Sequence, residues 1–423
     1  MNGTVVMKFG GTSVADAERL KRAAQRIVAK REMGNRVVAV LSARGKTTDF
    51  LIAEAQEISP HPDPRELDML LSTGERQSCA LCAMAINDLG HRAISLTGSQ
   101  AGIVTDTSHT KARILDVRAD RIRDALAEDS IVLVAGFQGV STAKDVTTLG
   151  RGGSDTTAVA LAAAIRADVC EIYTDVAGVF SADPRIVPDA RKLPVVSFEE
   201  MLEMSASGAG VLQLRSVEYA RNHGVRIHVL SSFDDGAGGM GTVIVGEEET
   251  VEQPLITAVT HSTEEARVTL KGVPDIPGIA GRIATALADA HVNIDMIIQN
   301  EPVSEGAVAD MSFTVPRTDL IDAGIALKPL CDELGIDVAT DEAMGKVSVI
   351  GAGMKSHPGV AAKVFTTLGD EAINIEMIAT SPIKISCVIA GAQVPDAVRA
   401  LHTAFELSGR DTIRPERPFG EFA

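Results

Sequence analysis

The chain has no tryptophan, only two tyrosines, and aromatic residues at just 3% of its 423 positions. Such a small supply of rings argues against the base-stacking platforms of proteins that bind single-stranded nucleic acid. Basic charge is also scarce, because 40 Lys and Arg face 57 Asp and Glu, which gives a net charge of -17 and a pI near 5.0. This charge repels nucleic acid and acidic membranes, so we expect neither as a partner.

Long apolar runs are absent too. No segment approaches the ~20 apolar residues of a membrane span, and no secretory leader precedes the first strand, so we expect a cytoplasmic protein. Five cysteines are scattered along the chain. Cys79 and Cys82 have a CxxC spacing, but they lie in an apolar, helix-like run without a second pair or a nearby histidine. This favours two buried thiols over zinc ligands, and we expect no protein-held metal.

The most informative stretch that is present runs Gly150-Arg151-Gly152-Gly153-Ser154-Asp155 and opens into an apolar helical segment. A glycine loop at a helix start lets backbone N–H groups approach a phosphate. Arg151 can fork onto a carboxylate or phosphate, and Asp155 can hold an ammonium group. The combination suggests a site that binds an amino acid next to a nucleotide. The alternative is an ordinary loop in which Ser154 or Asp155 caps the helix.

A second glycine loop stands near the N-terminus. A strand over residues 4–9 carries Lys8 and runs into Gly10, Gly11 and hydroxyl residues, followed by a helix predicted over 16–31. Lys8 is then a positive charge beside backbone that can wrap phosphate. Neither loop has the spacing of a P-loop or a dinucleotide site, so a different phosphate-binding fold is required.

Short β-rich runs alternate with helical stretches up to about residue 246. We predict strands at 37–41, 93–96, 131–135, 169–173 and 226–230, and helices at 68–89, 113–127, 154–166, 198–205 and 212–223. This alternation predicts a mostly parallel, helix-covered sheet that binds ligands beyond the carboxyl ends of its strands. Lys8, Ser42, Arg151 and Thr174 all fall at or just after predicted strands.

Beyond a glycine-rich and then acidic boundary at 234–253, the chain repeats itself. Residues 277–297 match 358–378 at a constant offset of 81, with ten identities in 21 positions. Each copy follows a predicted strand, at 266–271 and 346–351, and has Pro-Gly at a helix start and then an Asn-Ile strand. A duplicated packing domain without a ligand is the alternative to a pair of ligand-binding modules.

Five motifs together resemble those of the aspartate kinase family: Lys8 to Ser13, Gly74-Glu75-Arg76, Thr148 to Asp155, Tyr173 to Val176 and Ala182 to Arg185. The paired C-terminal modules resemble the family's ACT domains. The resemblance implies an α/β protein with an amino-acid-kinase-type sandwich and a mostly parallel sheet, followed by two ferredoxin-like βαββαβ ACT domains. It implies a catalytic domain at 1–246, a linker and strand at 247–262 that complete the second ACT domain, and ACT domains at 263–342 and 343–423.

The activity implied is ATP-dependent phosphorylation of the side-chain carboxylate of L-aspartate to 4-phospho-L-aspartate. This is the first step towards lysine, threonine, methionine and diaminopimelate. Mg²⁺ would bind mainly through the ATP phosphates, lysine and/or threonine would inhibit, and ACT pairing would give a homo-oligomer or hetero-oligomer. The alternatives are a kinase of the same fold acting on another acidic amino acid, and a catalytically inactive ACT sensor.

Family roles carry over position by position. The resemblance makes Lys8, Arg151 and Asp155 catalytic. It assigns aspartate to Ser42, Thr47, Glu75, Arg151, Ser154 and Asp155, and the nucleotide to Lys8, Phe9, Gly10, Gly11, Thr174, Asp175, Phe180 and Arg185. It assigns effectors to Asp275, Gly278, Ile279, Ala280, Asn293, Asp295, Gln299, Val360, Ala361, Asn374, Ile375, Thr380 and Ser381. Departures from common family forms are Arg44, Lys46, Gly210 and Pro382.

Overall fold

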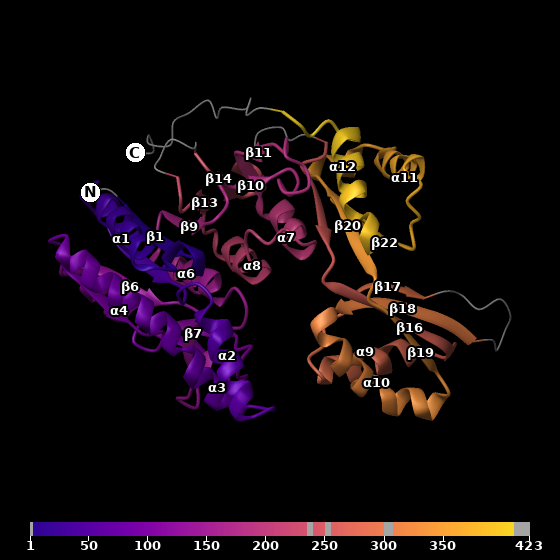
Figure 1. Ribbon diagram of the computed structural model, residues 1–423, viewed down its shortest axis with the longest axis horizontal. Helices are drawn as coiled ribbons and strands as arrows, with labels where there is room; N and C mark the ends of the chain where they lie inside the picture. The colour runs from indigo at the N-terminus through magenta and orange to yellow at the C-terminus, as the bar shows by residue number, and fades with distance from the viewer. Residues whose placement is uncertain (1–2, 235–239, 250–254, 300–307, 410–423) are drawn as a thin grey trace.

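The computed structural model describes residues 3–234, 240–249, 255–299 and 308–409. Figure 1 shows a large N-terminal α/β unit on the left and two smaller units on the right, the earlier one (orange) below the later one (yellow). Short 3₁₀ helices occupy Gly11–Val14, Glu247–Glu249, Arg317–Asp319, Ala352–Ser356 and Gly391–Gln393.

An eight-stranded sheet in the order β12-β14-β13-β9-β1-β2-β6-β3 forms the centre of the N-terminal unit. Its strands are β1 (Thr4–Phe9), β2 (Arg36–Leu41), β3 (Ala93–Leu96), β6 (Ile131–Ala135), β9 (Val169–Thr174), β12 (Val195–Ser197), β13 (Ile227–Ser231) and β14 (Thr242–Val245). All neighbouring pairs are parallel except β13 with β14. The mostly parallel sheet and all the strands predicted within it are confirmed.

Helices cover both faces of this sheet. The helices of the unit are α1 (Ala17–Glu32), α2 (Thr47–Ile58), α3 (Pro64–Leu71), α4 (Thr73–Asp88), α5 (Asp120–Ala127), α6 (Gly153–Ile165), α7 (Phe198–Ala206) and α8 (Leu214–His223). Buried residues of α1 and α4 pack on one face, and those of α5 to α8 pack on the other. Cys79 and Cys82 lie on α4 in the first of these cores as free thiols, and burial raises the pKa of Cys82 to about 12.

Two of the helix predictions are wrong in part. The stretch 113–127 contains strand β5 (Ile114–Val117) before α5 begins at Asp120, because β-branched residues there pair with β4 (Ile103–Thr105). The helix predicted at 68–89 breaks at Ser72 into α3 and α4. Strands β5-β4-β7-β8 form a small sheet with β7 (Gln138–Ser141) and β8 (Val146–Thr148), and β10 (Val179–Phe180) pairs with β11 (Lys192–Leu193).

The two C-terminal units each contain a four-stranded antiparallel sheet. The first comprises β16 (Glu265–Pro274), α9 (Ile279–Asp289), β17 (Asp295–Gln299), β18 (Val308–Pro316), α10 (Leu320–Leu334) and β19 (Asp337–Asp341). The second comprises β20 (Met344–Ile350), α11 (Val360–Asp370), β21 (Met377–Ser381), β22 (Lys384–Ala390) and α12 (Val394–Ala404). Its fourth strand is β15 (Ala258–Ser262), which precedes the first unit in sequence and pairs with β20.

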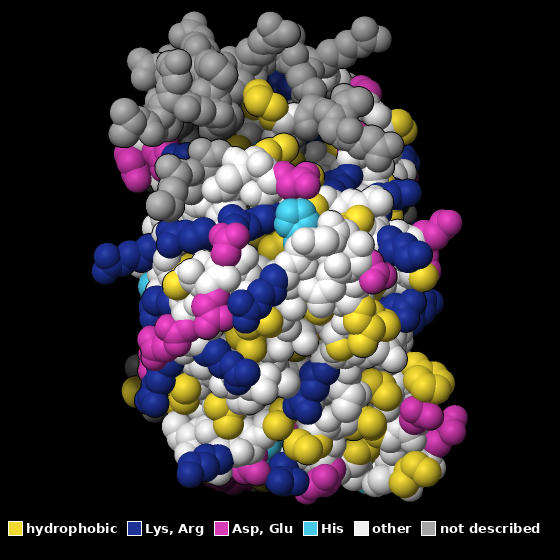
Figure 2. Space-filling view, turned by 90° about the vertical axis from the view of Figure 1, so that its left-hand side faces the viewer, with side chains coloured by type: hydrophobic (Ala, Val, Ile, Leu, Met, Phe, Trp, Pro, Cys, Tyr) yellow, Lys and Arg dark blue, Asp and Glu magenta, His cyan; other side chains and the backbone are white. Residues whose placement is uncertain are grey.

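The outer surface of the N-terminal unit mixes charges of both signs. Figure 2 shows Lys and Arg interspersed with Asp and Glu on this side of the molecule, so no continuous basic surface covers that face. Within the described ranges, no helix combines the length and apolar character needed to cross a membrane.

Candidate active site

The loops at the carboxyl edge of the main sheet bring a lysine and an aspartate together across 147 positions of sequence. Lys8 lies near the end of β1, and Asp155 lies in the first turn of α6. Lys8 Nζ is 2.6 Å from Asp155 Oδ1, and the two residues are only 9% and 7% exposed. A charged pair with so little solvent interacts more strongly than one on the surface. The structure therefore joins two of the three residues predicted to be catalytic.

Glycines allow three loops to approach closely around this pair. A Cβ at Gly11 would lie 2.8 Å from the Ala43 carbonyl oxygen, and one at Gly136 would lie 2.6 Å from Ser154 Oγ. Phe9 stands before these glycines, but its ring is buried and stacks on Tyr173 with centroids 4.7 Å apart. The loop after β1 can therefore offer backbone, and not the Phe9 ring, to a ligand.

The glycine loop before α6 depends on left-handed backbone. Gly150 and Gly152 have φ of +79° and +67°, and a Cβ at Gly152 would collide with the side chain of Gln213. Gly152 is the N-cap, and no side chain caps the helix. The alternative in which Ser154 or Asp155 is an ordinary cap is therefore wrong. Arg151 is exposed at the tip of the loop.

Glu75 is a buried acid beside this loop cluster. It lies in the first turn of α4, is 3% exposed, and accepts a hydrogen bond of 3.0 Å from the Ala43 N–H at Oε1. Its Oε2 has no hydrogen-bond partner among the described residues. Burial raises the pKa of Glu75 to about 7, although backbone hydrogen bonds oppose the shift. An adjoining ammonium group would supply the missing partner.

The loop at 42–47 presents the remaining predicted aspartate ligands. The Ser42 N–H donates to the Phe9 carbonyl, which places Ser42 next to the loop after β1, and Thr47 Oγ1 donates to the Arg44 carbonyl at 2.7 Å. Arg44 itself turns back to the Ala15 carbonyl at 3.3 Å, and Lys46 is exposed. The two unusual cations of this loop therefore differ: Arg44 is engaged with the backbone, whereas Lys46 faces solvent.

A polar network that the sequence analysis missed holds the base of the glycine loop. Asp68 on α3 is fully buried, accepts a 2.5 Å hydrogen bond from Thr148 Oγ1, and lies 2.8 Å from His109 Nδ1. Arg215 on α8 donates to the Leu149 carbonyl at 2.7 Å. Asp68 begins the helix predicted at 68–89 and shares a face with Glu75, so an acid at this position gave no distinct signal.

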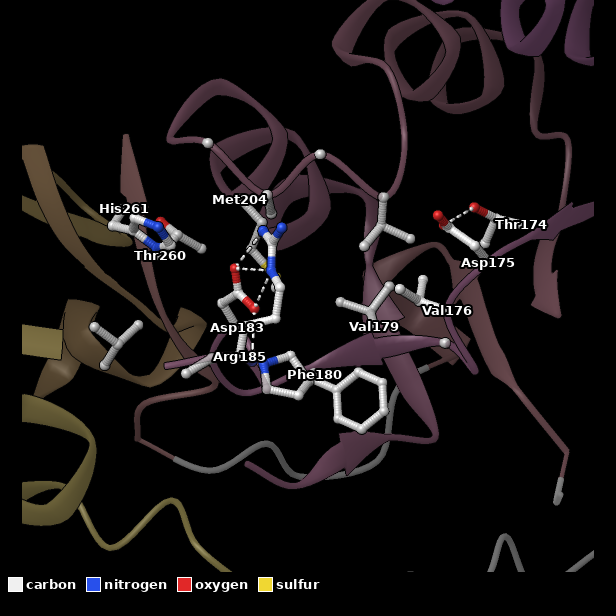
Figure 3. Close-up of a pocket in the computed structure, with 18 residues that line it drawn as sticks. Thr174, Asp175, Val176, Val179, Phe180, Asp183, Arg185, Met204, Thr260 and His261 are labelled. Carbon is white, nitrogen blue, oxygen red and sulfur yellow. Dashed lines mark hydrogen bonds and ion pairs between the residues drawn. The ribbon is translucent and has the colours of Figure 1, made fainter. Parts of the chain in front are cut away.

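Four of the residues predicted to bind the nucleotide line one cavity of about 410 Å³ (Figure 3). Thr174 and Asp175 lie at one side, while Phe180 and Arg185 come from the following hairpin and turn. Arg185 forms an ion pair of 2.7 Å with Asp183, and this contact holds the pKa of Asp183 below its ordinary value. The cavity volume suits a small-molecule ligand.

Three other elements complete this cavity. They are α7 through Met204, the loop after α7 through Gly208 to Val211, and strand β15 through Val259, Thr260 and His261. Of these residues only Gly210 was singled out from sequence, and a Cβ there would have nothing within 4 Å. The Gly10 N–H donates to the Tyr173 carbonyl at 3.2 Å, so the glycine loop after β1 adjoins the Thr174 end of the cavity.

The predicted effector residues lie at the start of α9 and along β17 in the first C-terminal unit, and at the start of α11 and along β21 in the second. Exposed members are Asp275, Gly278, Ala280, Asn293, Asp295, Gln299, Asn374 and Thr380, whereas Ala361, Ile375 and Ser381 are partly buried. Ile279 and Val360 point into the cores of their own units.

Two effector candidates are engaged with other parts of the chain. Asp295 Oδ2 lies 3.0 Å from Lys346 Nζ, and Ser381 Oγ donates to Glu203 Oε1 on α7 at 3.1 Å. Pro382, which follows Ser381, is exposed in the turn between β21 and β22. The second unit is thus tied to the N-terminal unit at its candidate effector strand.

Comparison with known proteins places these features in a family. Residues 3–231 match the amino acid kinase family, and residues 267–335 and 347–405 each match an ACT domain. The aspartokinase of Mycolicibacterium smegmatis is 56% identical over 411 residues, covering 96% of this chain and 97% of that protein. The aspartokinase of Corynebacterium glutamicum is 53% identical, with the same coverage.

Solved structures of aspartokinases have the same fold as this chain. E. coli aspartokinase III in complex with aspartate and ADP (R-state) superimposes with a TM-score of 0.82 at 26% identity, over 95% of this chain and 99% of that one. The same enzyme in complex with lysine and aspartate (T-state) gives a TM-score of 0.71 at the same identity and coverage.

Proposed function

Because the chain belongs to the aspartokinases of the amino acid kinase family, we propose the following assignment of its residues to their reaction. The reaction transfers the γ-phosphoryl group of ATP to the side-chain carboxylate of L-aspartate and yields 4-phospho-L-aspartate and ADP. It is the first step of lysine, threonine, methionine and diaminopimelate synthesis. The chain is an enzyme, with ACT domains that suggest allosteric regulation.

The pair of Lys8 and Asp155 at the carboxyl edge, 2.6 Å apart beside two glycine loops, carries this assignment. The attacking aspartate carboxylate is already ionised at pH 7, so no general base is required. A carboxylate oxygen attacks the γ-phosphorus, the bond to the bridging oxygen breaks, and ADP leaves with the electron pair. Lys8 and the amides of Gly10 and Gly11 stabilise the charge that spreads over the phosphoryl oxygens.

The substrate amino acid lies between the loop at 42–47, the start of α4 and the start of α6. Exposed Arg151 forks onto its α-carboxylate, and buried Glu75 receives its ammonium group together with Asp155. Ser42, Thr47 and Ser154 complete the site. The nucleotide extends from Lys8 into the cavity lined by Thr174, Asp175, Phe180 and Arg185.

Mg²⁺ enters with the nucleotide. Among the described residues, no group of three or more His, Cys, Asp or Glu is arranged to hold a metal. The ion would be carried mainly by the ATP phosphates, where it would neutralise phosphate charge. We further propose a cytoplasmic location, because the reaction consumes ATP, and the domain boundaries 1–246, 247–262, 263–342 and 343–423.

Lysine and/or threonine bind the ACT units and inhibit. Asp275 takes the ammonium group of the effector, and the amides near Gly278 at the start of α9 take its carboxylate. Feedback requires an effector that prefers the inactive state, by about 1 to 3 kcal/mol for ordinary coupling. ACT pairing between chains gives a homo-oligomer or hetero-oligomer. Titrating activity and binding with lysine, threonine and both together tests this inhibition. If neither amino acid binds, the ACT pair serves assembly alone.

The test of the reaction is a turnover assay with ATP, aspartate and hydroxylamine, which traps the acyl phosphate as a hydroxamate. Aspartate should give hydroxamate, and glutamate or acetylglutamate at the same concentration should give less than a tenth as much. Preferred turnover of another acidic amino acid would reassign the substrate, and no turnover at all would leave an amino-acid sensor.

A further inference from the structure

The cavity in Figure 3 is shared between the catalytic domain and the second ACT unit. Three lining residues, Val259, Thr260 and His261, come from β15. This strand belongs to the second ACT sheet, because it pairs antiparallel with β20 and places His261 opposite Val347. A site residue on β15 is therefore at once a residue of the regulatory sheet.

Strand β15 is fixed against the cavity on two sides. Its Val259 N–H donates to the Ser181 carbonyl at 2.8 Å, next to the lining residue Ala182. On the other side, Gly208 has φ of +101°, and a Cβ there would collide with the carbonyl oxygen of His261. Only glycine allows this approach, so the fold brings the loop after α7 and β15 into direct backbone contact.

An aromatic ring singles out His261 on this wall. Among the described residues that line the cavity, only Phe180 and His261 carry an aromatic ring, and burial lowers the pKa of His261, which favours its neutral imidazole. Figure 3 shows Thr260 and His261 on the side opposite Thr174 and Asp175. The glycine loop after β1, which the proposed function assigns to the phosphates, adjoins the Thr174 end, since the Gly10 N–H donates to the Tyr173 carbonyl. The His261 end is then the end available to a base and ribose.

We propose that β15 forms one wall of the nucleotide site and that the imidazole of His261 contacts the nucleoside end of ATP. This deepens the proposed function and rests on it. An aromatic ring at that position can lie against a purine face, while its nitrogens can bond the sugar or base. Because β15 is a strand of the second ACT sheet, any displacement of that sheet moves a wall of the nucleotide site. By linkage, nucleotide binding must then bias the position of the sheet as well.

Direct binding tests the contact. Dissociation constants for ADP and for inorganic tripolyphosphate are measured by calorimetry on the full chain, for wild type, His261→Ala and His261→Gln. His223→Ala, at the exposed end of α8, is the matched control. The contact with Gly208 uses the His261 backbone, so both substitutions leave it intact. Thermal unfolding by circular dichroism checks folding, and His261→Gln decides if the alanine variant does not fold.

We expect His261→Ala to weaken ADP binding by about fivefold or more. Tripolyphosphate binding and the aspartate KM should stay within twofold, as should every constant for the control. ADP affinity within twofold of wild type in a folded variant would overturn the proposal. An equal loss of affinity for tripolyphosphate would overturn it too, because His261 would then contact the phosphates. Failure of the proposed function can be told apart from failure of the His261 contact. In that case the wild-type protein would form no hydroxamate, whatever its nucleotide affinities are.

Discussion

Two buried lysines, one in each half of the molecule, hold carboxylates in different ways. Lys8 in the catalytic domain is 9% exposed and lies 2.6 Å from one carboxylate, that of Asp155. Lys346 on β20 is 1% exposed and lies between two, at 2.5 Å from Glu265 and 3.0 Å from Asp295. This difference in the number of partners agrees with the proposal that Lys8 serves a ligand, whereas Lys346 holds two parts of the fold together.

The surroundings of Lys8 and Lys346 differ in the same sense as the number of their partners. Lys8 lies among the glycine loops, where a Cβ at Gly10 would be 3.5 Å from Lys8 Nζ. Lys346 belongs to the contact between the two ACT sheets, where Met296, Met344 and Met377 form a small apolar cluster. Burial alone would lower the pKa of Lys346, but Glu265 and Asp295 outweigh it and raise that pKa. Lys346 therefore stays charged as a tie between the units.

These ties place the second ACT unit between the first and the catalytic domain. The first unit is joined to the second by Lys346 and by the 2.6 Å ion pair of Arg267 with Glu376. The second is joined to α7 of the catalytic domain by the 2.8 Å ion pair of Lys384 with Glu203. Figure 1 shows this order of units.

The largest expected effect is on stability at Lys346. Lys346→Ala leaves the buried Glu265 carboxylate without its cation, and breaking such a buried pair costs about 3 to 5 kcal/mol. We expect the free energy of unfolding of the ACT pair to fall by that amount, while turnover without effector changes less than twofold. Urea titration followed by circular dichroism measures the first, because the chain has no tryptophan for fluorescence. An unchanged urea midpoint would contradict the structural role of Lys346.

Lys8→Ala should produce the opposite pattern. Removal of an electrostatic group that acts on the transferring phosphoryl group costs about 10² to 10³-fold in rate. The hydroxamate assay measures kcat, and Lys346→Ala is the matched control, since it also removes a buried ammonium group. A Lys8→Ala protein that retains more than a tenth of wild-type turnover would mean that Lys8 does not act on the phosphoryl group.

The buried acid Glu75, next to the loop at 42–47, makes the stability of the fold pH-dependent. Burial raises the pKa of Glu75 from its ordinary 4.5 to about 7, so the folded protein keeps a proton that the unfolded chain loses in this range. The contribution of Glu75 to stability is therefore fully present below about pH 4.5 and falls by at most about 3 kcal/mol as pH rises to 7. Glu75→Gln should remove that part of the slope in unfolding experiments between pH 5 and 8. Glu57→Gln, at an exposed site on α2, should not; equal slopes in wild type and Glu75→Gln would refute the shift.

The smallest effect concerns an exposed cation. Arg151 sits at the tip of the glycine loop, and lysine in its place cannot reproduce a bidentate fork on a carboxylate. Arg151→Lys should raise the aspartate KM by about tenfold, with the ATP KM within twofold. Initial rates with each substrate varied in turn provide the comparison. An equal rise in both constants would assign Arg151 to the nucleotide.

Local pattern predicted most elements of the fold. The strands of the main sheet and the helices α1, α6, α7 and α8 appear where periodicity placed them. The error at 114–117 has a tertiary cause, because this segment becomes a strand only through pairing with β4. The Asp68 network and the contribution of β15 to the cavity lined by Thr174 and Arg185 were also missed. A single buried acid and a five-residue strand leave no periodic signal.

The sequence by itself determined three features. They are the alternation of strands and helices that makes a mostly parallel sheet, the glycines at positions where the backbone is left-handed or crowded, and the duplicated C-terminal module. These depend on neighbouring residues, so they can be read along the chain. Only the tertiary structure decided that Lys8 meets Asp155, that Lys346 ties the ACT units together, and that β15, besides pairing with β20, lines a cavity with Thr174 and Arg185. Such contacts depend on the path of the chain over scores of residues, which no local preference specifies.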